Sequence, residues 1–108
     1  MNGQVLPKDK KIDVQVTTGN YGLNLRISTY DKMAIVYLSG QVNANIPQWS
    51  TLATVPIARE QVLAPDISHP GNYIIVNYDG RVVNERVYSS GDWITMTATY
   101  FLDDRESN

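Results

Sequence analysis

The sequence contains no cysteine and a single histidine, His69. Without cysteine there is no disulfide framework, thiolate metal site or cysteine nucleophile, and a zinc site would need three carboxylates. No apolar run approaches the roughly 18 residues of a membrane-spanning helix. Nine basic and eleven acidic residues give a net charge of −2, which provides no positive footprint for nucleic acid. We therefore expect no metal, no cofactor, no nucleic-acid partner and no membrane insertion.

Catalytic motifs are also missing. There is no glycine-rich phosphate loop, no His-Glu-x-x-His pattern and no Gly-x-Ser-x-Gly elbow. A serine triad would depend on His69, which stands in a His-Pro-Gly loop. Paired carboxylates can hydrolyse glycosides, but Asp79 and Asp92 stand at turn positions. The sequence predicts a protein without catalytic residues.

What the chain has in abundance is β-branched residues. Eleven Val, nine Ile and eight Thr are accompanied by seven Tyr and two Trp, and these side chains fit a pleated sheet better than a helix. The one helix-like window, residues 57–64, is confined between Pro56 and Pro65 and allows a single turn at most. We predict an all-β domain, an antiparallel β-sandwich or jelly-roll-like barrel of about seven to eight strands.

The individual strands are predicted from the alternation of apolar and polar residues and, at 33–39, from a more continuous apolar run that suggests a central strand. They are expected at 12–16, 23–28, 33–39, 42–46, 49–55, 73–78, 81–87 and 93–102. The first should bury one face, Asp79-Gly80 should form a hairpin turn, and 56–72 should be the long loop. We divide the chain into a leader or connector with the first strand (1–22), a β head domain (23–102) and an acidic tail (103–108).

The last strand has two different faces. Ile94, Met96 and Ala98 lie on one face, whereas the threonine row Thr95, Thr97 and Thr99 lies on the other. Such a row suits a sheet that packs on symmetric copies of itself, and a solvated edge is the alternative. We predict these three threonines at a subunit interface. Among the aromatic residues, Trp49 follows a proline at the start of a strand and is expected to pack in the core or on a face of a sheet.

Several segments stand in a recognisable order. They are MAIVYLSG at 33–40, QWSTLATVP at 48–56, VNYDGRV at 76–82, GDWI at 91–94 and ATYFL at 98–102. In this order they resemble the C-terminal head domain of phage tail-fibre and baseplate receptor-binding proteins. One departure is the segment 57–64, where that family has a glycine-aromatic turn and an arginine before its second proline.

The resemblance implies a homotrimer at the phage tail tip that binds polysaccharide of the bacterial cell wall or surface without catalysis. Other tail or baseplate proteins would be its partners. The resemblance does not fix the binding residues. From their residue types and their places in the long loop and the late hairpins, we expect hydrogen bonds to sugar hydroxyls from His69 and Asp66, stacking from Tyr73 or Tyr88, and contacts at the rim of the site from Arg86 and Trp93. Two alternatives stay open. One is a trimeric structural adaptor or spike tip that binds no glycan, and the other is a monomeric carbohydrate-binding module of an enzyme.

Overall fold

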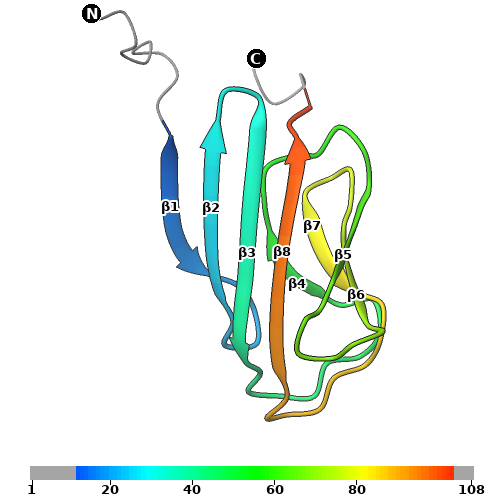
Figure 1. Cartoon of the computed structure of the whole chain (residues 1–108). Coiled ribbons are helices and arrows are strands. Elements are labelled where there is room, and N and C mark those ends of the chain that lie inside the picture. Colours follow the sequence, from blue (N-terminus) through cyan, green and yellow to red (C-terminus); the bar gives the residue numbers. More distant parts are fainter. Residues whose placement is uncertain (1–11, 104–108) are drawn as a thin grey trace, which may run out of the picture.

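The computed structural model describes residues 12–103, which form eight strands and no helix. The described part of the chain therefore has no helix that could cross a membrane. The first sheet has the order β1 (Asp13–Thr18), β2 (Asn24–Tyr30), β3 (Met33–Gln41) and β8 (Trp93–Phe101). The second has the order β4 (Thr51–Thr54), β7 (Arg81–Asn84), β6 (Tyr73–Val76) and β5 (Val62–Pro65). All the pairings are antiparallel, and the two sheets form a sandwich (Figure 1), which confirms the predicted all-β fold.

β8 follows the period of two expected from the sequence, whereas β3, expected from its continuous apolar run to be a central strand, lies inside the sheet and also alternates between buried and more exposed residues. β3 and β8 pair from Met33–Phe101 to Gln41–Trp93, so residues opposite each other share a face of the sheet. The inward residues of both strands are buried in one core, which the second sheet covers. They include Ala34, Val36, Leu38, Ile94, Met96, Ala98 and Tyr100. The predicted division of the last strand into two faces is confirmed.

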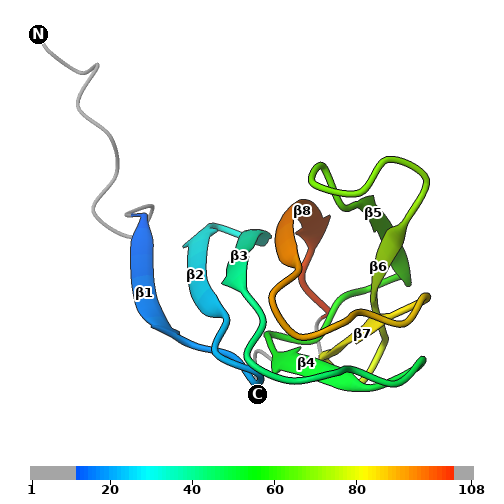
Figure 2. The same ribbon diagram turned by 90° about the horizontal axis from the view of Figure 1, so that it is seen from below.

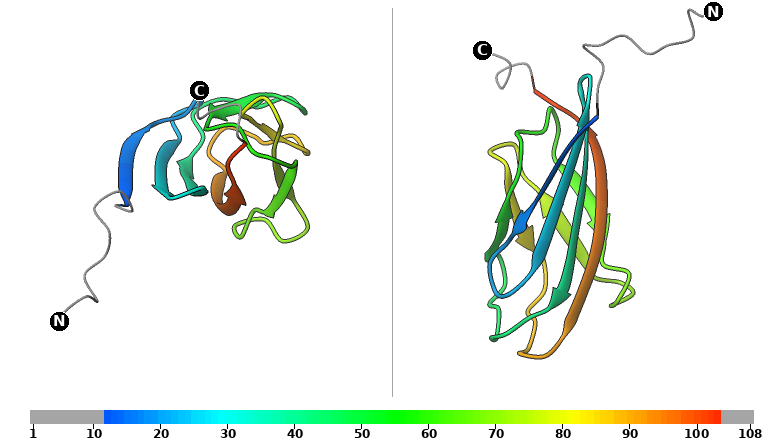
Figure 3. Two further views of the ribbon diagram at one scale, coloured as in Figure 1. Left: turned by 90° about the horizontal axis from the view of Figure 1, so that it is seen from above. Right: turned by 90° about the vertical axis from the view of Figure 1, so that its left-hand side faces the viewer.

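The first strand contradicts the prediction that it buries one face. Every residue of β1 is exposed, including Val14 at 58% and Val16 at 75%. Val14 lies opposite Ser28 and Val16 opposite Arg26, so both valines are on the outer face of the first sheet. Figures 2 and 3 show the physical reason: β1 overhangs the sandwich, and no strand of the second sheet lies beneath it.

The middle of the chain differs from the sequence prediction in two places. The expected strand 42–46 is absent, and Ile46 forms only an isolated bridge with Tyr88. Residues 57–64 were expected to lie in a loop with at most one helical turn. The end of this window instead belongs to β5, which pairs with β6. Pro65 is tolerated there because β5 is the edge of its sheet. A four-residue strand beside a proline has too short a pattern to be recognised before its partner is known.

The predicted Asp-Gly hairpin between β6 and β7 is confirmed. Gly80 adopts a φ of +86°, and a Cβ at this position would lie 2.3 Å from the main-chain oxygen of Val55. Asp79 Oδ1 accepts a hydrogen bond from the Arg81 main chain, and this bond is the chief reason why the pKa of Asp79 is lowered. Most of the predicted leader and acidic tail, residues 1–11 and 104–108, lies outside the described residues.

Candidate functional site

A buried carboxylate organises the loop after β5. Asp66 is 1% exposed, and its Oδ1 accepts hydrogen bonds from the main-chain N–H groups of Ser68 (3.0 Å) and Thr95 (2.9 Å). Its Oδ2 accepts one from the Tyr88 hydroxyl at 2.7 Å and lies 3.2 Å from His69 Nδ1. The bond to Ser68, two residues on, is the local turn that aspartate favours. The bond to Thr95 ties this loop to the first sheet.

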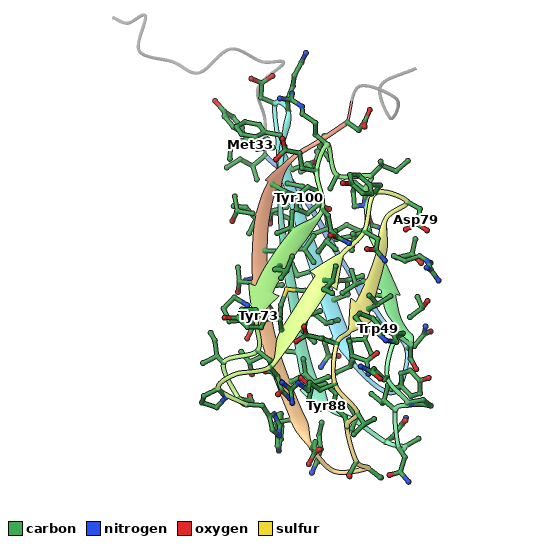
Figure 4. The ribbon with its side chains drawn as sticks, turned by 90° about the vertical axis from the view of Figure 1, so that its right-hand side faces the viewer. Met33, Trp49, Tyr73, Asp79, Tyr88 and Tyr100 are labelled. Carbon is green, nitrogen blue, oxygen red and sulfur yellow. The ribbon has the colours of Figure 1, made fainter. Side chains whose placement is uncertain are left out.

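Tyr88 is the second buried member of this arrangement. Burial, followed by the hydrogen bond to Asp66, raises the pKa of Tyr88, so the hydroxyl stays a neutral donor. The His69 ring meets the Tyr88 ring edge to face, with centroids 5.3 Å apart. Asn72 Nδ2 donates to the Tyr88 hydroxyl at 3.4 Å. We call Asp66, His69, Asn72 and Tyr88 the Asp66 cluster; Figure 4 shows Tyr88 at the lower end of the sandwich.

The Asp66 cluster brings together three of the six predicted ligand residues. Asp66 and Tyr88 are buried, so in this conformation neither offers a surface to a ligand, and their contacts fix the position of His69. The His69 side chain is 35% exposed. Ser68 Oγ lies 2.9 Å from Thr95 Oγ1, so this hydroxyl does not complete a nucleophilic arrangement with His69.

The other three predicted ligand residues lie elsewhere. Tyr73 opens β6 and is 41% exposed, and Arg86 is exposed just after β7. Trp93 lies opposite Gln41 on the outer face of the first sheet, the face that also holds Thr97 and Thr99. The structure therefore divides the predicted set between the Asp66 cluster, the second sheet and the outer face of the first.

The outer face of the first sheet gathers exposed apolar side chains. Of the fourteen large hydrophobic residues exposed in the described chain, eight lie there. They are Ile12, Val14, Val16, Tyr30, Met33, Ile35, Trp93 and Phe101. Hollows of about 240 and 140 Å³ separate their side chains between β1 and β3. The threonine row lies on the same face of β8.

Sequence reasoning did not single out Trp49 as a ligand residue and expected it in the core or on a face of a sheet. Its side chain is 56% exposed, and its φ is +63°, a left-handed conformation that is rare for a bulky residue. Asn84, which is fully buried, holds this turn: its Oδ1 accepts from Ser50 N, and its Nδ2 donates to the carbonyls of Pro47 and Arg86. Only the proline before Gln48 hinted at a turn, and no signal in the sequence pointed to Asn84.

A separate groove of about 510 Å³ lies between β5 and β8, at the opposite end of β8 from the Asp66 cluster. Arg59 lies over the Phe101 ring there, 5.3 Å from its centroid. Among residues 12–103, no group of three or more histidine, aspartate or glutamate side chains is arranged to hold a metal ion.

A scan against protein families finds no family that matches this chain, and a search of curated proteins finds no match. The resemblance to phage head domains is therefore carried by the order of its motifs alone.

Proposed function

We propose that this chain is a non-catalytic head domain of a phage tail fibre or baseplate, which assembles as a homotrimer and binds polysaccharide on the bacterial cell surface. The order of the sequence motifs suggests the class. The observation that carries the proposal is the outer face of the first sheet, where eight large apolar side chains are exposed. The proposed place of action is the tail tip of the virion, in contact with other tail or baseplate proteins.

The outer face is unsuited to a free surface. On this face β1 presents two exposed valines, Val14 and Val16. Contiguous apolar patches on soluble proteins commonly mark an interaction surface. Thr97 and Thr99 lie on the same face, and their hydroxyls can form hydrogen bonds across a symmetric interface. A second and a third copy of the chain are the proposed occupants of this face.

The opposite end of the sandwich supports the recognition half of the proposal. The Asp66 cluster lies away from the end at which β1 begins and β8 ends (Figures 1 and 4). Its hydrogen bonds hold the loop in one conformation, which lowers the entropy that the loop loses when it binds a ligand. His69 is one ring side chain of this region that reaches solvent. Tyr73, the residue after Asn72, is another.

Light scattering on a size-exclusion column tests the assembly. The expected mass is three times the chain mass of 12.1 kDa. Ile35→Lys places a charge on the outer face and should yield monomers, whereas Val87→Lys, at a 67% exposed position away from that face, should leave the mass unchanged. A wild-type mass of one chain at micromolar concentration would overturn the homotrimer.

Binding to purified bacterial cell-wall polysaccharides, immobilised on a sensor, tests the recognition. The proposed head should bind at least one of them, and its avidity should fall when Ile35→Lys separates the subunits. A trimer that binds none would instead be the structural adaptor. A monomer that binds one would instead be a carbohydrate-binding module.

A further inference from the structure

We infer that the outer face of the second sheet holds a saccharide-stacking platform formed by Trp49 and Tyr73 with Glu85 between them, and that its ligand is an uncharged glycan of at least two linked sugar rings. This inference rests on the proposed function and adds to it the place and the chemical class of the ligand. Of the ligand residues predicted from the sequence, only Tyr73 belongs to this platform.

The strand register aligns Tyr73 with Glu85, and a main-chain hydrogen bond places Trp49 beside the same end of β7. Ile74 lies opposite Asn84, which places Tyr73 opposite Glu85, and Glu85 N donates to the Tyr73 carbonyl at 3.3 Å. On the other side of β7, Thr51 lies opposite Val83, and Trp49 N donates to the Asn84 carbonyl at 2.9 Å. The row therefore crosses β6, β7 and the segment leading into β4. Figure 4 looks onto this sheet and shows Tyr73 and Trp49 at nearly the same height.

The neighbouring row provides a firm base. Ile75 pairs with both Val83 and Leu63, and these residues point away from the core, since Ile74 and Val76 point into it. Ile75 and Val83 are nevertheless only 8% and 4% exposed, so side chains on the outer face cover them. Leu63 at the edge is 55% exposed. The platform thus stands on a closely packed sheet rather than on a loose loop.

The backbone conformation of Trp49 indicates that the exposure of its ring serves a function. A left-handed backbone is unfavourable for a residue with a Cβ, and a glycine would remove that cost. The buried amide of Asn84 nevertheless uses both of its polar atoms to hold this turn, with hydrogen bonds of 2.7 to 2.8 Å. Gln48 adds a bond to the Glu85 carbonyl at 2.9 Å. A rigid, strained turn that exposes a large ring is typical of functional positions.

The chemistry of the row favours a neutral sugar. The flat ring of tryptophan or tyrosine stacks against the apolar face of a pyranose, and a carboxylate accepts hydrogen bonds from its hydroxyls. Two spacings between neighbouring strands separate the backbones of the two aromatic residues, about 9.5 Å, which two linked sugar rings can span. Glu85 between them would repel a phosphorylated or uronic polymer, and the net charge of −2 adds to this repulsion.

The test measures binding of the full chain to two immobilised panels, neutral and phosphorylated bacterial cell-wall polysaccharides. We expect binding to a neutral polysaccharide, with Trp49→Ala and Tyr73→Ala each weakening it by about tenfold or more. Tyr78→Ala is the matched control, because Tyr78 is 57% exposed but lies in the β6–β7 turn, and it should bind as the wild type does. Circular dichroism verifies that each variant is folded.

Tryptophan fluorescence locates the site without relying on loss of binding. In Trp93→Phe the only tryptophan is Trp49, and its emission should shift when the neutral polysaccharide is added. In Trp49→Phe the emission of Trp93 should not change. If neither Trp49→Ala nor Tyr73→Ala weakens polysaccharide binding, the platform is overturned and the proposed function still stands. The same holds if the polysaccharide shifts only the emission of Trp93. Binding to no polysaccharide would overturn both, and preference for the phosphorylated panel would overturn the ligand class.

Discussion

Replacing Asp66 with alanine is the most direct test of how the cluster is held. The substitution removes the acceptor for four donors, of which the Thr95 main-chain N–H and the Tyr88 hydroxyl are the least accessible to water. Ser68 and His69 are exposed enough to bond to water instead. Each buried donor left unpaired costs about 1–3 kcal/mol, so two such donors reduce the free energy of unfolding by about 2–6 kcal/mol.

Urea denaturation followed by circular dichroism provides the measurement. With an m-value of about 2 kcal/mol/M, Asp66→Ala should lower the midpoint by about 1–3 M. Asp66→Asn keeps an oxygen for the two main-chain donors and should lose less, about 1–2 kcal/mol. Asp79→Ala is the control, because the Asp79 side chain is 58% exposed and pairs with Arg81 in a hairpin turn. Equal midpoint shifts for Asp66→Ala and Asp79→Ala would refute the assignment of Asp66 as the residue that holds the loop.

Three further predictions follow from single contacts. The folded-state pKa of Tyr88 is raised above its ordinary value near 10, so its stabilising contribution is complete below pH 10 and is lost as the pH rises further. Denaturation at pH 8 and at pH 11 should therefore show that the free energy of unfolding falls more for the wild type than for Tyr88→Phe. Asn84→Ala should lower the free energy of unfolding by about 2–4 kcal/mol, since three hydrogen bonds of a buried amide are lost, and an unchanged urea midpoint would count against its role. Gly80→Ala should cost about 1–2 kcal/mol or more in the same assay, because of its positive φ and the close Val55 oxygen; a stabilised protein would contradict this.

Local sequence patterns were sufficient for the general architecture. The excess of β-branched residues predicted an all-β chain, and the two-residue alternation along β8 correctly separated inward from outward side chains. The continuous apolar run at 33–39 correctly predicted a strand inside the sheet, since β3 lies between β2 and β8. Asp79-Gly80 correctly predicted a hairpin, because the glycine can take a positive φ that the turn requires. These features depend on neighbouring residues in the chain, and therefore the sequence alone carries them.

The alternation in β1 shows where this reasoning stops. Val14 and Val16 were correctly placed on one face of a strand, but that face is exposed. A period of two tells which residues share a face and not which face meets the core. The register with β2, which sets Val14 opposite Ser28 and Val16 opposite Arg26, decides that the valines face outward. In the same way, β5 exists because β6 offers it an edge to pair with.

The candidate site was predictable in part. Six residues were predicted as ligand contacts, and the structure brings three of them, Asp66, His69 and Tyr88, together, although it buries two of these. Trp49 was expected in the core or on a face of a sheet. It is exposed in a turn that Asn84, distant in the sequence, holds by hydrogen bonds. Residue type determined which side chains can bond or stack. Only the tertiary structure decided which of them face solvent, because burial depends on contacts between segments far apart in the chain.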